Sequence, residues 1–513
     1  MHILMNTLIS RFLRPLATAI ILAAATTTGA HADLPAPIAA ALAEQRIPAS
    51  KVSLVVRALD DRGRGAALLR HNAATARNPA SVIKLLTTLA ALETLGPDYR
   101  WETAYLADGA IRNGTLHGDL ILRGGGDPFI TVEDFLGHLL ALRQTGLRRI
   151  NGDLVIDNSR FAPAHHDPAA FDRQPTRSYN TAPDAALINL SATRFVVEPR
   201  GGRITARAEP PLAGLRIDNR IKALGGTCKG KGGNWSYRIA RDDSARGADR
   251  RQSGARISLR PIRVRLQGAY RAQCGEDELI RSIVPNAEYT CRLFTSLWRE
   301  MGGKSGGCRL GAAPPRARRL LAREGAPLAD IITGINKFSN NVMTRQLLLT
   351  LAAPRVDADG DGEPDTAQPA SRPATSAAGV AAIRAWLAKS GLAMPSLVMD
   401  NGAGLSRTSR ASAAGLSRLL AHAWRGSYRP EFLSSLPLAA TDGTMRKRLS
   451  ESALRGRARI KTGLIDNIRS MAGYVHARDG RHYAVAMMID SRRVNFWSGN
   501  AVQDAVLEWV FAR

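Results

Sequence analysis

Hydrophobic residues follow two different spacings along this chain, and together they predict an α/β protein. Apolar and polar residues alternate in KVSLVVRAL (51–59) and AALLRHN (66–72), which predicts two strands. A longer apolar stretch begins at Pro79 and predicts a helix that ends at Gly96 and Pro97. The C-terminal end predicts three more strands and a last helix, in RARIKTG (457–463), IRSMAGYVHA (468–477), RHYAVAMMID (481–490) and AVQDAVLEWVFA (501–512).

The middle of the chain has a different character. Residues 106–285 contain short strand-like runs punctuated by glycine, and the runs at Gly118 and Gly152 share the pattern G-D-L-x-(I/V), like two related hairpins. Helical patterns return from about residue 286. We therefore expect one α/β domain built from residues 33–105 and 286–513, interrupted by one or two β-rich domains at 106–285.

The first 32 residues have the pattern of a secretory signal peptide. Arg11 and Arg14 precede a short apolar run, LATAIILAAA (16–25), and Ala30-His31-Ala32 fits a cleavage site. The alternative is an uncleaved anchor. No later run of about 18 apolar residues predicts a membrane span. We therefore exclude residues 1–32 from the fold and expect the mature protein in the periplasm.

Export changes the interpretation of the four cysteines. An even number of cysteines in an oxidising compartment favours disulfides, and no Cys/His spacing indicates zinc. Three pairings are possible. We favour Cys228–Cys274 and Cys291–Cys308.

A net charge of +27 favours an anionic neighbourhood, such as a membrane surface, a wall polymer or nucleic acid. Export argues against nucleic acid, and so do the aromatic content of 5% and the absence of interleaved basic and aromatic residues. The alternative is a solvated cationic surface without a specific partner.

The segment NPASVIKLLTT (78–88) places a serine three residues before a lysine at the start of the predicted helix. With Asn78 as the helix cap, Ser81 and Lys84 lie on one face of the first turn. A serine hydroxyl needs a base to act as a nucleophile, and a buried lysine at a helix N-terminus can lose its proton near neutral pH. This spacing alone is far more often that of a capping serine beside a solvated lysine.

Two further motifs favour the catalytic interpretation. Ser339-Asn340-Asn341 precedes a predicted helix, and Lys461-Thr462-Gly463 ends a predicted strand. The order SxxK, SxN, KTG is that of penicillin-binding proteins and class A β-lactamases. With NPASVIKLLTTLAALETLGPDYRWET, YNTAP and MDNGAGLSR, the chain resembles the D-alanyl-D-alanine carboxypeptidases/endopeptidases of the peptidase S13 family, the low-molecular-weight class C penicillin-binding proteins.

This resemblance implies a penicillin-binding-protein/β-lactamase-like transpeptidase fold, an antiparallel sheet flanked by helices with a helical subdomain and inserted β-rich domains. It also implies roles. Ser81 would attack the carbonyl between two D-alanines of a peptidoglycan stem peptide, and Lys84 would take its proton. Ser339 would relay a proton to the leaving amine, Asn341 would orient Lys84 and the substrate amide, and Lys461 would attract the terminal carboxylate. Thr462, Gly463 and the amides of Ser81 and Leu464 would bind the substrate. β-Lactams would be covalent inhibitors, and no cofactor is expected.

Leu464 departs from the family, which usually has serine or threonine after KTG. A hydroxyl contact to the substrate carboxylate would therefore be missing. The loop Asp400–Arg407, with Gly402 and Gly404, is expected to border the site, either as a glycine-dependent turn or as a direct substrate contact.

A second loop resembles a calcium site, because alternating carboxylates surround a glycine. Its members are Asp357, Asp359, Asp361, Gly362 and Asp365, and Gln368 stands where an EF-hand has glutamate. The alternative is an acidic solvated linker. His165 and His166 lack a ligand spacing, and LRGGGDP (122–128) lacks the spacing of a nucleotide-binding loop.

Two other functions remain as alternatives to a serine D-Ala-D-Ala peptidase. A β-lactamase would use the same nucleophile, but the long insert and the lack of a Glu-x-x-x-Asn element between SxN and KTG argue against it. A non-catalytic, cationic wall-binding protein would not need all the motif hydroxyls and lysines.

Overall fold

The computed structural model describes residues 34–163, 166–228, 230, 232–241, 254, 256–353 and 372–513. The expected signal peptide (1–32), the calcium-like aspartates 357–365 and His165 therefore lie outside the described residues. No helix in the described part of the chain is both long enough and apolar enough to span a bilayer.

A five-stranded antiparallel sheet joins the two ends of the chain, in the order β17-β18-β19-β1-β2. Its strands are β1 (Val52–Leu59), β2 (Ala67–His71), β17 (Ala458–Ile465), β18 (Ile468–His476) and β19 (His482–Asp490). Val52 lies opposite Ile489, so the first long strand pairs with the last one. Residues from both ends of the chain therefore share one sheet, with the KTG strand β17 at its edge.

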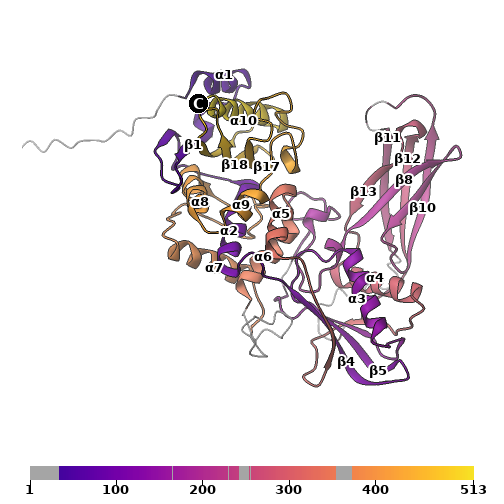
Figure 1. The fold of residues 1–513 in the computed structure, drawn as a ribbon. Helices are drawn as coiled ribbons and strands as arrows, with labels where there is room; N and C mark the ends of the chain where they lie inside the picture. The colour runs from indigo at the N-terminus through magenta and orange to yellow at the C-terminus, as the bar shows by residue number, and fades with distance from the viewer. Residues whose placement is uncertain are drawn as a thin grey trace, which may run out of the picture.

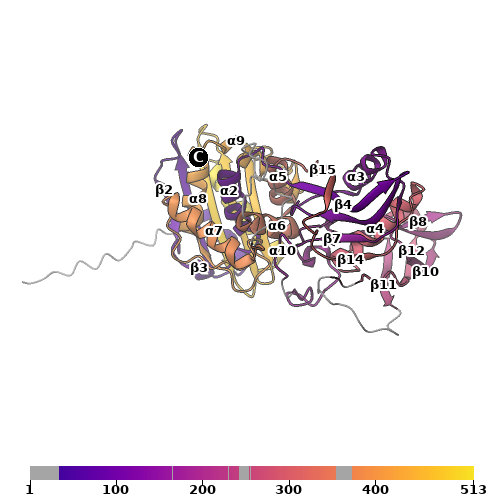
Figure 2. The ribbon, with the colours of Figure 1, turned by 90° about the horizontal axis from the view of Figure 1, so that it is seen from below.

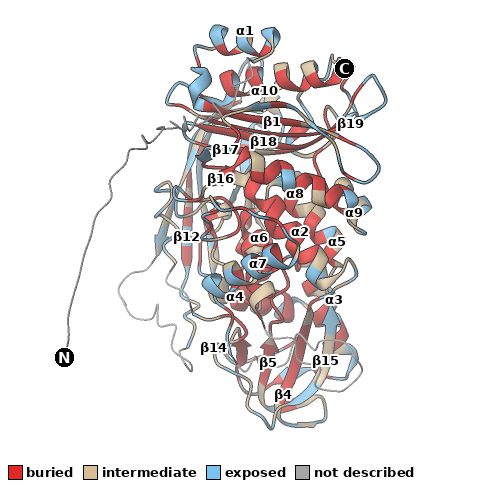
Figure 3. Cartoon of the chain, turned by 90° about the vertical axis from the view of Figure 1, so that its left-hand side faces the viewer, coloured by how far each residue is buried: buried red, intermediate tan, exposed pale blue. Residues whose placement is uncertain are grey.

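Helices cover both faces of this sheet and make three layers (Figure 3). On one face α1 (Ala36–Glu44) packs against α10 (Phe496–Phe511). On the other face α8 (Ala413–Arg425) packs against β1 and β19, and the buried helix α2 (Lys84–Leu95) contacts its helical neighbours. These are α5 (Leu328–Phe338), α6 (Asn341–Ala352), α7 (Ser376–Lys389) and α9 (Arg429–Ser435). The short strands β3 (Ala76–Arg77) and β16 (Ala411–Ser412) pair beside this layer.

The insert lies to one side of this body and contains three further sheets (Figure 2). The first has the order β14-β7-β5-β4-β15, with β6 on β5, and is covered by α3 (Val132–Gln144) and α4 (Asn286–Glu300). Its strands are β4 (Glu102–Arg112), β5 (Thr115–Arg123), β6 (Arg149–Ile150), β7 (Leu154–Asp157), β14 (Cys308–Leu310) and β15 (Arg318–Glu324).

The other two sheets form a sandwich that projects from the molecule (Figure 1). One has the order β13-β8-β9 and the other β10-β12-β11. Their strands are β8 (Thr193–Arg200), β9 (Arg203–Glu209), β10 (Leu215–Leu224), β11 (Gly233–Arg241), β12 (Ile262–Arg271) and β13 (Asp277–Arg281). Strands β5 to β13 lie within residues 106–285, the range expected to be rich in β-structure, but the helix α3 lies there too.

Two details of the insert differ from the sequence-based expectation. Strands β14 and β15 pair with β7 and β4, and buried Phe294 and Trp298 of α4 join the insert core. We therefore propose a boundary near residue 325 in place of 285, because the helical pattern of α4 does not reveal which core it joins. The two G-D-L runs are parallel neighbours, not hairpins, and Asp119 accepts a hydrogen bond from the amide of Asp153 at 2.7 Å.

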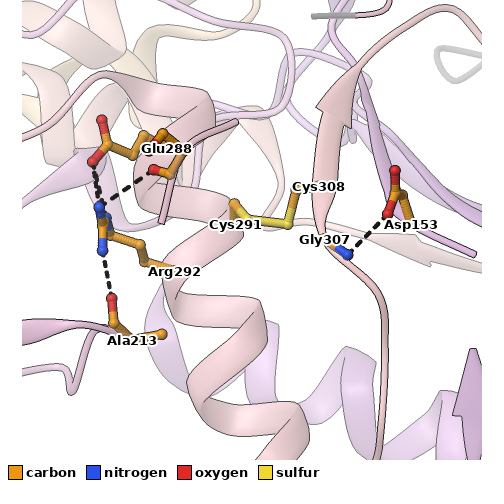
Figure 4. The surroundings of a disulfide bond; sticks show 8 residues. Asp153, Ala213, Glu288, Cys291, Arg292, Gly307 and Cys308 are labelled. Carbon is orange, nitrogen blue, oxygen red and sulfur yellow. Dashed lines mark hydrogen bonds and ion pairs between the residues drawn. A yellow bond between two sulfur atoms is a disulfide. The ribbon is translucent and has the colours of Figure 1, made fainter. Parts of the chain in front are cut away.

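The structure pairs Cys228 with Cys274 and Cys291 with Cys308, the pairings favoured from the sequence. The second bond ties α4 to β14 (Figure 4). Next to it, the amide of Gly307 donates to Asp153 Oδ1 at 2.8 Å. This disulfide therefore closes a 17-residue connection between two parts of one core.

We expect the double variant Cys291→Ala/Cys308→Ala to unfold more easily, because the unfolded chain loses a loop constraint worth about 3 kcal/mol. The measurement is the midpoint of urea unfolding without reductant, which should fall relative to the wild type. An unchanged midpoint would show that this bond does not stabilise the insert.

Candidate active site

The segment around Ser81 begins its helix later than the sequence predicts. Residues Ala80–Ile83 form a 3₁₀ turn, and α2 starts only at Lys84. Asn78 Oδ1 accepts from the amide of Ala80 at 2.8 Å, and Ala80 takes the left-handed conformation with φ 45°. This local turn replaces the first helical turn, but Lys84 Nζ still lies 2.9 Å from Ser81 Oγ.

Lys84 is fully buried and surrounded by oxygen acceptors. Besides Ser81 Oγ, its Nζ contacts Asn341 Oδ1 at 2.6 Å and the carbonyl of Ala403. Burial lowers the pKa of Lys84 well below its usual range, and the charges of Lys461 and Arg345 lower it further. A neutral amine can donate its two hydrogens to Asn341 and Ala403, which leaves its lone pair facing Ser81.

The Ala403 carbonyl was not predicted from the sequence, and its loop explains why it reaches Lys84. Asn401 Oδ1 accepts from the amides of Ala403 and Gly404 at 3.0 and 3.2 Å. Gly404 has φ 76°, and a Cβ there would come within 1.9 Å of the Ala80 carbonyl. The glycines of the Asp400–Arg407 loop are the sequence feature that could have indicated this contact, because they allow the loop backbone to pack directly on the Ser81 turn.

The other two motifs meet beside this pair. Ser339 ends α5 in the left-handed conformation with φ 57°, and Asn340 caps α6, accepting from the amide of Met343 at 3.0 Å. Lys461 Nζ, from β17, donates to Ser339 Oγ at 2.9 Å. Burial lowers the pKa of Lys461 to about 7. All five residues expected to be catalytic are therefore brought together, from the 3₁₀ turn and the first residue of α2, the α5–α6 junction and the edge strand.

The residues after Lys461 lie along the same strand. Thr462 Oγ1 donates to Thr444 Oγ1 at 2.8 Å. Gly463 passes so close to the Ser81 turn that a Cβ would come within 2.9 Å of the Pro79 carbonyl and 2.1 Å of Ser470 Oγ. Leu464 is 52% exposed, so its side chain is available to a ligand.

A buried arginine, not predicted from the sequence, connects this site to the insert. Arg345 lies one turn after Asn341 on α6 and donates to the carbonyls of Tyr179 and Thr181, both at 2.8 Å. Its Nε also donates to the Asn341 carbonyl at 3.4 Å. Burial lowers the pKa of Arg345 to about 10, so it remains charged at neutral pH. A permanent positive charge here disfavours a second one on Lys84.

The fold and this arrangement of serine and lysine residues define a penicillin-binding-protein-like serine peptidase. The model of the D-Ala-D-Ala carboxypeptidase 3 (S13) family matches residues 34–511, and the chain belongs to this family.

Relatives and solved structures agree with this assignment. The chain is 24% identical over 425 residues to the D-alanyl-D-alanine carboxypeptidase DacB of Haemophilus influenzae, covering 82% of each chain. It is 26% identical over 444 residues to the D-alanyl-D-alanine carboxypeptidase of Actinomadura sp. strain R39, covering 83% of this chain and 76% of that one. The crystal structure of H. influenzae penicillin-binding protein 4 (dacB) has the same fold, with a TM-score of 0.70, 20% identity, and coverage of 92% of this chain and 99% of the other.

We expect Arg345→Met to move the acid limb of Ser81 acylation to higher pH. Removing this charge raises the pKa of Lys84, so its neutral form appears only at a pH higher by on the order of one unit. The measurement is the acylation rate by a fluorescent penicillin across pH. Arg345→Lys, which keeps the charge, is the matched control and should shift less. Equal profiles for Arg345→Met and the wild type would contradict this role.

We expect Leu464→Thr to raise kcat/KM on a D-Ala-D-Ala peptide about 10-fold, because a hydroxyl can donate to the substrate carboxylate. Leu464→Val removes a methylene without adding a hydroxyl and is the control. If Leu464→Thr leaves kcat/KM unchanged, the leucine does not weaken carboxylate recognition.

Proposed function

We propose that this chain is a serine-type D-Ala-D-Ala carboxypeptidase, with D,D-endopeptidase activity on the same stem peptides, acting through an acyl-enzyme on Ser81. The observation that carries this proposal is the 2.9 Å contact between Ser81 Oγ and the buried Nζ of Lys84. A nucleophile with an uncharged base in contact is the requirement for acyl transfer by serine.

In the first step Lys84 takes the proton of Ser81 as Oγ attacks the carbonyl carbon between the two D-alanines. The amides of Ser81 and Leu464 stabilise the oxyanion that forms. Lys461 attracts the terminal carboxylate, and its contact with Ser339 (2.9 Å) supports a proton path to the leaving amine. The C–N bond breaks, the terminal D-alanine leaves as the amine, and water then hydrolyses the ester on Ser81. A β-lactam enters the same first step and acylates Ser81.

Export belongs to the same proposal. The charged and apolar pattern of residues 1–32 supports a cleaved signal peptide, and peptidoglycan is reached from the periplasm. The two disulfides support an oxidising compartment.

The test is mass spectrometry of defined peptidoglycan fragments incubated with the wild type, Ser81→Ala, and the exposed-serine control Ser434→Ala. We expect the wild type and Ser434→Ala to remove one D-alanine from pentapeptides or to split cross-linked dimers, and Ser81→Ala to do neither. Fluorescent penicillin should label the same two active proteins.

Other outcomes would contradict the proposal in distinct ways. Rapid turnover of a chromogenic cephalosporin without peptide cleavage would indicate a β-lactamase. Neither label nor cleavage, with wall binding undiminished in Ser81→Ala, would indicate a non-catalytic wall-binding protein.

A further inference from the structure

The β-sandwich of the insert has two outer faces that differ in how their charges are balanced. Its inner faces pack together through buried residues such as Phe195 and Val197 on β8 and Val264 and Leu266 on β12. Both outer faces are rich in arginine. The ion pairing of the arginines can therefore be compared between the two outer faces of the same sandwich.

On the outer face of β13-β8-β9 the arginines are matched by glutamates. Arg194 forms ion pairs with Glu209 and Glu276, both at 2.7 Å, and also with Glu278. Arg207 forms ion pairs with Glu209 at 2.7 Å and with Glu276 at 3.1 Å. The charges of this face are largely compensated within the protein.

Among the residues that the structure describes, the outer face of β10-β12-β11 has no such balance. Its cations form what we call the basic face: Arg216, Arg220, Lys222, Arg238, Arg263 and Arg265. Within the described residues of these three strands Asp218 is the sole carboxylate, in contact with Arg220 at 3.1 Å and Arg265 at 2.9 Å. Arg216 lies in register with Arg263, and Arg265 with Arg238. Like charges in register on neighbouring strands destabilise a sheet unless an anion lies between them.

The shape and composition of the basic face indicate the kind of anion. Side chains on one face of a sheet repeat about 7 Å along a strand and about 5 Å across strands, so the cations form a two-dimensional array. The aromatic residues of these strands, Trp235, Tyr237 and Tyr270, pack against the insert core and not on this face, which gives sugars or bases nothing to stack on. A guanidinium group can bind a phosphate with two parallel N–H···O hydrogen bonds.

We propose that the basic face docks on an anionic phospholipid membrane through the phosphates of its headgroups. A planar array of phosphates matches a planar array of cations better than one polymer strand does. The docking would hold the sandwich, and with it the peptidase body, at the membrane surface. This inference does not depend on the catalytic proposal.

The test is co-sedimentation at low salt with vesicles of phosphatidylglycerol and phosphatidylcholine, compared with phosphatidylcholine alone. The protein used in this assay starts at residue 33, so that the apolar run 16–25 cannot contribute to vesicle binding. We compare the wild type with Arg216→Gln/Lys222→Gln/Arg263→Gln, and with a control triple of equal charge loss, Arg112→Gln/Arg200→Gln/Arg203→Gln. Circular dichroism and the midpoint of thermal unfolding check that each variant is folded.

We expect binding to the anionic vesicles alone, a loss of about 100-fold in the basic-face triple, and a much smaller loss in the control triple. Raising the salt should weaken wild-type binding. Equal losses in both triples would overturn the proposal, because net charge and not this face would then be responsible. Binding to polyphosphate or to wall fragments without binding to vesicles would overturn the membrane as the partner.

Discussion

The burial of two lysine side chains in one small space is the constraint on which the rest of the site depends. A charged ammonium removed from water is costly, and two of them near each other are costlier still. The protein places Lys84 and Lys461 at 0% exposure, and within the described part of the chain no carboxylate is among their hydrogen-bond partners. Burial and the charges of Lys461 and Arg345 lower the pKa of Lys84 well below its usual range, and a lysine without its proton is the base that Ser81 needs.

The surrounding elements follow from this requirement. Asn341 reaches Lys84 because Ser339 breaks the helical run and Asn340 starts a new helix. The Ala403 carbonyl reaches it because glycines let its loop lie against the Ser81 turn. The same helix α6 also fixes the insert: the side-chain amide of Gln346 both donates to the carbonyl and accepts from the amide of Asp184, at 2.8 and 2.9 Å. The insert and the catalytic groups are thus supported by one helix.

The sequence located the residues of the candidate site better than it located the boundaries of helices and domains. Ser81, Lys84, Ser339, Asn341 and Lys461 could be found because their residue types and spacings are specific, and the terminal strands because their alternation is regular. The late start of α2 could not be predicted from the sequence, because it depends on an Asn78–Ala80 hydrogen bond and on contacts with β17 and the Asp400–Arg407 loop. The assignment of α4 to the insert was missed for a similar reason: a helical pattern shows which face is buried, not what buries it. Backbone groups such as the Ala403 carbonyl, and a buried cation such as Arg345, carry no residue pattern of their own.

The most direct test of this account is the protonation state of Lys84 itself. The ¹³Cε and ¹⁵Nζ NMR signals of lysine-labelled protein can be followed across pH, with Lys84→Arg to assign the signal. The account predicts a Lys84 signal that is already that of a neutral amine at neutral pH and becomes charged only on acidification. A Lys84 signal that stays charged until pH approaches the usual lysine pKa of about 10.4 would contradict it.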